Sequence, residues 1–357
     1  MTNEYSTYSS QAPLQTPVSN LGAAPGEALA QTIRQAYESS PSEDANTFDA
    51  NPAKKGLAII CPVHNEAKVI PLFFERMKPV MEALASDYEV SLIFSNNAST
   101  DTTLESIEKI RNENKNVYVI SLSSNVGYQR SLECGLKNSH GDLFAFIDVD
   151  CEDPPEMILS FIKAYEEGYD IVYGERADRE EPEYVKFLRK IFYRILRAVA
   201  DEEVILDMAE FSLMTKEVRD AIVQDNTSFP FIRASIGRVG FRRKGITYKR
   251  HRRIAGDSHY NFFSMTKFAI AGILSSSTLF LRIPIYSLPA FLLLMIALPS
   301  AYVLTSNAWW LVATFFLFTL YVSSTVSFIA IYVARIYKNT LGRPNSIIDR
   351  RTSHLQS

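Results

Sequence analysis

The stretch LFAFIDVDCEDPP, residues 143–155, joins a short apolar run to a turn rich in carboxylates and proline. The run 143–147 has the length and composition of a strand that is buried on both faces of a sheet. Asp148 and Asp150 follow it directly, so both side chains are expected near the edge of that sheet. Two carboxylates this close repel each other unless a counterion lies beside them. The stretch therefore predicts a strand that ends in a divalent-cation site; a solvated acidic turn is the alternative.

The same pattern of apolar run and polar turn recurs upstream. Strands are predicted at residues 56–61, 88–94 and 117–122, and helices at 67–85, 103–112 and 129–137; a further strand is predicted at 170–174. Strands that alternate with helices of this length predict βαβ units, and hence an α/β fold with a Rossmann-like, mostly parallel sheet. Ligands of such sheets bind beyond the carboxyl ends of the strands. The polar turns after these strands therefore predict a nucleotide site at one edge of the sheet.

The acidic turn has the chemistry of a magnesium site. Asp148 and Asp150 can hold a hard cation against a diphosphate, with phosphate oxygens and water completing its coordination, and Glu152 is a candidate third ligand.

The three cysteines, Cys61, Cys134 and Cys151, lack CxxC spacing, which argues against a zinc site or a disulfide framework. Lys and Arg total 37 against 40 Asp and Glu, so net charge indicates no particular partner.

The C-terminal part of the chain predicts a membrane anchor. Ile283 to Ala334, roughly fifty residues, contains no charged side chain, about twice what one membrane helix needs. We expect spanning helices at about 284–304 and 308–334; a buried hairpin of a soluble core is the alternative. Lysines and arginines flank the pair and none lies in the connecting turn, which predicts that the large N-terminal region and both termini face the cytoplasm.

Four segments together resemble glycosyltransferase family 2. They are Ala58-Ile-Ile-Cys-Pro-Val-His-Asn-Glu66, Asn96-Asn-Ala-Ser-Thr-Asp101, Asp148-Val-Asp-Cys-Glu-Asp-Pro-Pro155 and the two spans. Over residues 56 to 335 the chain is most similar to the polyprenyl-phosphate glycosyltransferases, the group of dolichol-phosphate-mannose synthase and bactoprenol glucosyltransferase. The resemblance implies a GT-A fold, an inverting mechanism, a nucleotide-sugar donor, Mg²⁺ or Mn²⁺, and a polyprenyl phosphate acceptor. Relatives can be homo-oligomers.

The resemblance also implies roles for individual residues. It assigns nucleotide-sugar binding to Pro62, Asn65, Glu66, Asn96, Asn97, Asp148 and Val149, metal binding to Asp148, Asp150 and Glu152, phosphate or acceptor binding to Arg176, Arg179, Arg253, Ser258 and Tyr260, and catalysis to Asp207 or Glu210 together with Arg253. The chain departs from the family where Asn96 and Asn97 replace two aspartates, which leaves the base open. Glu152 stands where many relatives have Gln, Glu210 replaces an Asp and Ser212 an Arg.

Several basic segments can each be interpreted in two ways. Arg176 and Arg179 can bind phosphate, or they can form surface salt bridges with Glu180 or Glu181. A basic, amphipathic helix predicted at 186–197 suits anionic lipid better than plain solvent, and the basic cluster at 242–253 suits either phosphates or lipid. No nucleic-acid-binding module accompanies these charges, so no nucleic-acid partner is expected. His64 and His251 are interpreted as structural or solvated.

The predicted organisation is a disordered tail at 1–55, a GT-A domain at 56–260, an interfacial helix at 261–282, two membrane helices at 283–335 and a cytoplasmic basic tail at 336–357. The predicted protein is an integral protein of a bacterial-type inner membrane that makes a polyprenyl-phosphate sugar on the cytoplasmic face. UDP-glucose is the first donor expected and GDP-mannose the second, with flipping of the product left to a separate protein. The alternatives are another acceptor, or an inert nucleotide-sugar binder suggested by Asn96 and Asn97.

Overall fold

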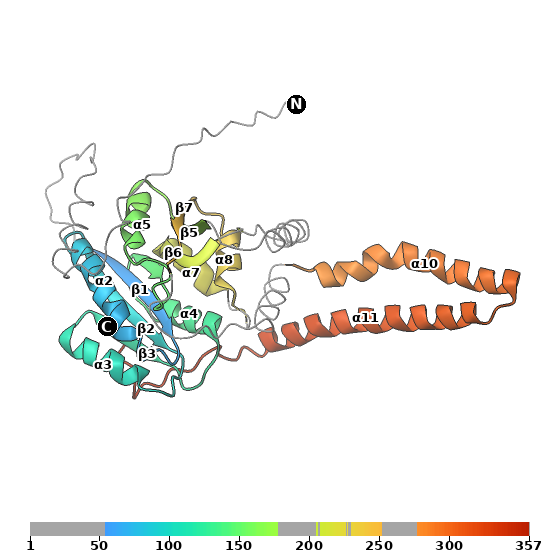
Figure 1. The fold of residues 1–357 in the computed structure, drawn as a ribbon, viewed down its shortest axis with the longest axis horizontal. Helices are drawn as coiled ribbons and strands as arrows, with labels where there is room; N and C mark the ends of the chain where they lie inside the picture. The colour runs from blue at the N-terminus through green and yellow to red at the C-terminus, as the bar shows by residue number, and fades with distance from the viewer. Residues whose placement is uncertain are drawn as a thin grey trace, which may run out of the picture.

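A computed structural model describes residues 54–177, 205, 208–225, 227, 230–251 and 277–356. Within these residues the chain forms a seven-stranded sheet with helices on both faces, and a long helical hairpin that extends from one end (Figure 1). The strands are β1 (Lys55–Val63), β2 (Tyr88–Asn96), β3 (Val117–Ser121), β4 (Leu143–Phe146), β5 (Ile171–Ala177), β6 (Met208–Thr215) and β7 (Arg243–Lys249). Every strand predicted from the sequence is present, with small differences at its ends.

The sheet has the strand order β3-β2-β1-β4-β6-β5-β7. β1 pairs in parallel with β2 and β4, and β2 pairs in parallel with β3. β6 is antiparallel to both of its neighbours, β4 and β5, and β7 is parallel to β5. The prediction of a mostly parallel α/β sheet is confirmed. As a consequence, the carboxyl ends of β1, β2, β3, β4 and β5 and the beginning of β6 meet at one edge.

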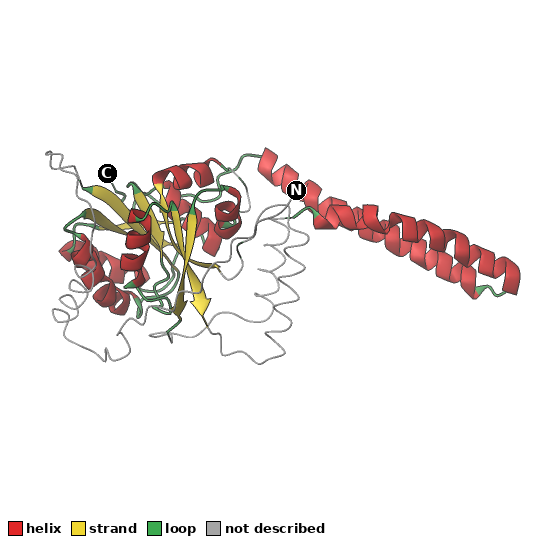
Figure 2. Ribbon diagram, turned by 90° about the horizontal axis from the view of Figure 1, so that it is seen from above, coloured by secondary structure: helices red, strands yellow, loops and turns green. Residues whose placement is uncertain are grey.

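Helices cover the sheet on both faces, which Figure 2 shows as red ribbons on either side of the yellow strands. They are α2 (Ile70–Leu84), α3 (Thr103–Glu113), α4 (Tyr128–Lys137), α5 (Met157–Glu166), α7 (Lys216–Gln224) and α8 (Ile232–Arg238). Side chains of β1 alternate between the two cores: Leu57 and Ile59 pack with α2, α3 and α5, whereas Ala58 and Ile60 pack with α4, α7 and α8. A strand buried on both faces accounts for the continuous apolar run that the sequence shows.

The hairpin consists of α10 (Leu279–Thr305) and α11 (Trp309–Thr340), with mean hydropathies of 2.0 and 1.8 over their most apolar windows. At 1.5 Å per residue, helices of 27 and 32 residues are about 40 and 48 Å long, more than the roughly 30 Å hydrocarbon core of a bilayer. No residue of either helix is buried in the protein, unlike the hairpin of a soluble core. The two helices are able to span a membrane and suggest membrane association.

The segment after α11 returns to the sheet, which the sequence did not predict. Ile348 and His354 form antiparallel bridges with Leu122 and Val119, so the segment lies along β3, an edge strand (Figure 1). The helix predicted at 186–197, residues 1–53 of the predicted tail and most of the predicted interfacial helix lie outside the described residues. The predicted domain boundaries, and the disorder of the N-terminal tail, therefore stay predictions.

Candidate active site

Three residues at the carboxyl edge of the sheet have a left-handed backbone although none of them is glycine. Asn65 follows β1, Ala98 follows β2 and Cys151 follows β4, with φ of 57°, 51° and 54°. For L-residues this conformation costs roughly 1–2 kcal/mol. Among the described residues, only Ser306 in the turn of the hairpin is another non-glycine with positive φ. Strain of this kind collects where function needs an unusual backbone, so these three turns identify the edge as the candidate active site.

The turns after β1, β2 and β3 are joined by a polar network around Asn97. The buried Asn97 side chain donates from Nδ2 to Asn125 Oδ1 at 3.0 Å and accepts from the Val126 amide at 2.9 Å. Asn125 Nδ2 lies 3.1 Å from His64 Nε2, and His64 Nδ1 lies 3.0 Å from the Asn97 carbonyl oxygen. These contacts fit a neutral imidazole with its proton on Nδ1. His64 is therefore a structural part of this edge.

Asn96 and Asn65 shape the next two turns. The buried Asn96 accepts at Oδ1 from the Ser99 amide at 3.1 Å and donates from Nδ2 to Ser121 Oγ at 3.4 Å. The exposed Asn65 donates from its backbone to Ser99 Oγ at 3.0 Å and accepts at Oδ1 from the Thr100 amide at 2.8 Å. Both asparagines therefore hold backbone turns, and Asn65 is the one whose surface faces solvent.

The acidic turn after β4 holds two carboxylates in a confined space. Tyr128, at the start of α4, donates to Asp148 Oδ1 at 2.8 Å. Asp150 is 7% exposed and accepts at Oδ1 from the Glu152 amide at 3.1 Å. Burial, followed by the charges of Asp150 and Asp153, raises the pKa of Asp148 to about 7. The negative charge of this turn is therefore not fully neutralised by positively charged groups of the protein around it.

A divalent cation fits this charge imbalance. A cation beside Asp148 and Asp150 would favour their ionised forms and so reverse the raised pKa of Asp148. Across the ranges that the structure describes, no group of three or more His, Cys, Asp or Glu side chains is arranged to hold a metal. The two aspartates therefore fit an ion with few protein ligands, whose remaining positions go to phosphate oxygens and water, as is usual for Mg²⁺.

A buried cluster of charges lies next to the two aspartates. Asp153 is 1% exposed, accepts from Tyr248 Oη, and pairs with Arg176 Nη2 at 3.4 Å and with Arg250 Nε at 3.5 Å. Arg250 also pairs with Glu152, so the carboxylate of the candidate third metal ligand is already neutralised by a guanidinium group. Burial opposes the charge of Arg176, but Asp153, Tyr248 and Asp148 together outweigh that effect and raise the pKa of the guanidinium. Arg176 therefore stays charged at the edge of the acidic turn.

Glu210 lies near the start of β6, the strand that pairs with β4. It is 6% exposed and accepts at Oε1 from Gln129 Nε2 at 2.9 Å. Arg233 Nε of α8 lies 2.9 Å from the same oxygen, an ion pair whose angle does not meet hydrogen-bond geometry. Glu210 Oε2 is buried and has no hydrogen-bond partner. After burial and the nearer acidic groups, Glu210 also contributes to the raised pKa of Asp148, so the two carboxylates belong to one site.

The structure brings together most of the residues that the sequence selected. The residues at or beside the carboxyl edge are Pro62, Asn65, Glu66, Asn96, Asn97, Asp148, Val149, Asp150, Glu152, Arg176 and Glu210. Pro62 and Val149 are buried. Asp207, Arg179, Arg253, Ser258 and Tyr260 lie outside the described residues, as do Glu180 and Glu181, the alternative partners of the arginines.

Four side chains of the site were missed by sequence reasoning. Tyr128 and Gln129 follow directly on the turn after β3, and this position at a strand's carboxyl end was a signal that could have identified them. Arg233 belongs to α8, and only the packing of distant elements brings it to the edge, so no local pattern indicates it. Arg250 follows β7 and lies in the basic cluster at 242–253, which the sequence linked to phosphates or lipid and not to the acidic turn.

Comparison with known proteins places this site in a family. The model of glycosyl transferase family 2 matches residues 58–239. An uncharacterized glycosyltransferase of Bacillus subtilis, YkcC, is 31% identical over 305 residues, which cover 82% of this chain and 93% of that protein. The prophage bactoprenol glucosyl transferase homolog of Escherichia coli K12 is 31% identical over 233 residues, covering 64% of this chain and 75% of that protein. Glucosyl-3-phosphoglycerate synthase from Mycobacterium tuberculosis, solved with Mn²⁺, UDP and phosphoglyceric acid, has 18% identity and a TM-score of 0.45 over 62% of this chain and 78% of that chain.

Proposed function

Since the chain belongs to glycosyl transferase family 2 and is a glycosyltransferase, we propose that it transfers one sugar from a nucleoside-diphosphate sugar to a polyprenyl phosphate, with inversion at the anomeric carbon. The observation that carries the proposal is the pair Asp148 and Asp150 at the end of a buried strand, with Arg176 and Glu210 close enough to add their charges to the site. A carboxylate pair of this kind suits a cation-bound diphosphate, and a neighbouring arginine suits a second phosphate.

The acceptor is proposed from two observations. Several relatives are named bactoprenol glucosyl transferases, among them those of Escherichia coli and of the Shigella phage SfV. The apolar hairpin of this chain suggests that the domain works at a membrane, where a lipid-linked phosphate is available. We propose further that the domain and both termini lie on the cytoplasmic side of a bacterial-type inner membrane, and that a separate protein flips the product.

The proposed reaction is an in-line displacement. An oxygen of the acceptor phosphate attacks the anomeric carbon, the bond from that carbon to the diphosphate breaks, and the nucleoside diphosphate leaves with the bonding electrons. A phosphate monoester has a second pKa of about 6, so the acceptor is largely ionised near neutral pH and no strong base is needed. Positioning and neutralisation of charge therefore account for more of the rate than proton transfer.

The residues of the chain have separate roles in this scheme. Asp148 and Asp150 hold a divalent cation, Mg²⁺ or Mn²⁺, which when bound neutralises charge that develops on the leaving diphosphate. Tyr128 orients Asp148 through its hydrogen bond of 2.8 Å. Glu210, held by Gln129 and Arg233, orients the acceptor with Asp207, while Arg176 faces the phosphates. We assign closure over both phosphates to Arg253, Ser258 and Tyr260, and further phosphate contact to Arg179; Glu152 remains a proposed third metal ligand.

For the donor we propose UDP-glucose first and GDP-mannose second. Asn65, Glu66 and the turn of Asn96 and Asn97 are the proposed base and ribose contacts. A second candidate function, an inert nucleotide-sugar binder, is suggested by Asn96 and Asn97, which stand where the family resemblance implies two aspartates. Homo-oligomerisation is an additional expectation.

The test is a transfer assay with full-length protein in detergent. Undecaprenyl phosphate, Mg²⁺ or Mn²⁺ and a panel of labelled nucleotide sugars are mixed with the wild type and with Asp150→Ala. We expect one label to pass to the lipid with the wild type and none with the variant. Binding of a nucleotide sugar without transfer of any label from the whole panel would support the inert binder instead.

A further inference from the structure

The C-terminal segment 345–356 lies along β3 and reaches the turn that carries Asn96. Two pairs of backbone hydrogen bonds define its path: Val119 exchanges bonds with His354 at 3.0 and 2.7 Å, while Ser123 donates to Ile347 at 2.9 Å and Asp349 donates to Ser121 at 2.8 Å. Asn345 begins the segment with bonds of 2.8 Å to Glu133 and to the Thr227 carbonyl oxygen. The segment therefore follows β3 from Val119 to its end and continues alongside Ser123.

Ser121, the last residue of β3, is the point where this segment meets the candidate donor site. It is 2% exposed, and its amide donates to Ser353 Oγ at 2.8 Å. Its hydroxyl donates to the Thr352 carbonyl oxygen at 3.0 Å. A serine hydroxyl has one proton to donate, so once that proton points to Thr352 the oxygen can only accept. That accepting oxygen faces Asn96 Nδ2 at 3.4 Å.

The orientation of the Asn96 amide follows from this arrangement. With Nδ2 directed at Ser121, Oδ1 is free to accept from the Ser99 amide at 3.1 Å, and this bond closes the turn of residues 96–99. That turn contains Ala98 in a left-handed conformation and supplies Ser99 Oγ to the backbone of Asn65. A strained turn persists only where its surroundings hold it in place. The C-terminal segment is one of these surroundings.

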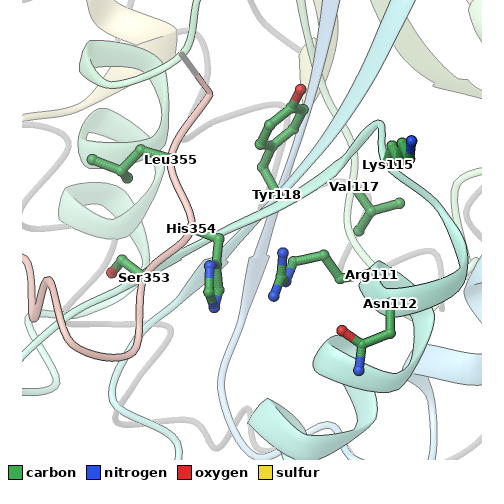
Figure 3. A pocket seen from close by; sticks show the side chains of 8 residues that line it. All are labelled: Arg111, Asn112, Lys115, Val117, Tyr118, Ser353, His354 and Leu355. Carbon is green, nitrogen blue, oxygen red and sulfur yellow. The ribbon is translucent and has the colours of Figure 1, made fainter.

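The attachment of the segment is mostly polar. Ile348 packs against the core as a partly buried side chain. Between the segment, α3 and β3 an open groove of about 580 Å³ remains, with Arg111, Lys115 and Tyr118 on one side and His354 on the other (Figure 3). None of the residues that line the groove belongs to the candidate active site. Loss of one polar contact should therefore loosen the segment locally without unfolding the domain.

We propose that the C-terminal segment 345–356 positions the donor nucleotide, because it fixes Ser121 and, through Ser121, the turn that carries Asn96 and Asn97. Residues 341–344 join α11 to the segment, so the end of the apolar hairpin is connected to the turn of residues 96–99 through residues 341–353 and Ser121. The role of the turn in holding a nucleotide rests on the proposed function; the coupling of the segment to the turn does not.

The test compares three single variants of the full-length protein. Ser353→Ala removes the acceptor of the Ser121 amide, and Ser353→Thr keeps a hydroxyl there. Gln356→Ala is the matched control, because Gln356 also anchors the segment, through the His140 amide and Ser91, but makes no contact with the turn of Asn96. In Ser353→Ala, we expect the amides of residues 96–100 to exchange with deuterium about fivefold faster, and the KM for the nucleotide sugar to rise about fivefold with little change in kcat.

We expect Ser353→Thr to keep both the exchange rate of residues 96–100 and the KM close to those of the wild type. We expect Gln356→Ala to leave both quantities unchanged. Equal effects in Gln356→Ala and Ser353→Ala, or no effect in Ser353→Ala, would overturn the proposal. Hydrogen exchange is measured without nucleotide, so it decides the coupling even if the wild type fails to transfer sugar. That failure would count against the proposed function alone.

Discussion

Removal of the charge at position 148 should stabilise the metal-free protein at high pH. Asp148→Asn keeps an oxygen to accept from Tyr128 but has no proton to lose. The pKa of Asp148 rises from 3.8 to about 7 on folding, owing first to burial and then to the charges of Asp150 and Asp153. The folded protein therefore holds a proton that the unfolded chain releases, so its stability falls as pH rises from about 4 to about 7.

The size of the effect follows from the shift in pKa. At 1.36 kcal/mol per unit, a shift from 3.8 to about 7 corresponds to about 4.5 kcal/mol above pH 7, and to about 1.5 kcal/mol at pH 5. Between these two pH values, the wild type should lose about 3 kcal/mol relative to Asp148→Asn. For a domain of this size that difference corresponds to a melting temperature lower by roughly 8 °C.

The assay is thermal unfolding of full-length protein in detergent with EDTA, at pH 5 and pH 8, for the wild type and Asp148→Asn. Glu89→Gln, which removes an exposed carboxylate of β2, is the control for loss of one charge. Addition of Mn²⁺ at pH 8 should raise the melting temperature of the wild type and close the gap. If Asp148→Asn melts at or below the wild-type temperature at pH 8 without metal, the reasoning from uncompensated charge is refuted.

Other variants test the remaining roles. Asp150→Ala should abolish sugar transfer while the protein stays in the membrane fraction; full activity would refute the metal assignment. Glu210→Gln should cost less activity than Asp150→Ala in the transfer assay, because the acceptor phosphate is already ionised. Arg176→Ala should lower the free energy of unfolding by about 3 kcal/mol, measured by denaturant titration, because it leaves the buried Asp153 with less positive charge. Arg253→Ala should lower kcat more than it lowers membrane association; the opposite result would favour a lipid-surface role.

Much of the fold could be predicted from local patterns in the sequence. The runs that became β1, β2 and β4 were recognisable because a strand covered on both faces is apolar over most of its length. The hairpin was recognisable for a related reason, since only a long run without charge suits a bilayer. The acidic turn after β4 was identified because its two aspartates stand at a strand's end, where parallel sheets bind ligands.

The rest depends on contacts between distant parts of the chain. The sequence does not show that β6 lies between β4 and β5 and runs antiparallel to both, because that depends on long-range pairing. Nor does it show that Arg233 faces Glu210. Residues 345–356 read as a polar tail, yet their backbone pairs with an edge strand, and backbone pairing leaves little trace in side-chain composition.

The most direct test of the account is the binding of Mn²⁺ in the presence of UDP, followed by electron paramagnetic resonance of the free ion. With the wild type in detergent, we expect about one ion bound per chain when UDP is present, in line with a site whose remaining ligands are phosphate oxygens. Asp148→Asn and Asp150→Ala should each lose that ion, while Glu89→Gln retains it. Unchanged, stoichiometric binding in both aspartate variants, or none in the wild type, would contradict a cation held between these two carboxylates and a diphosphate.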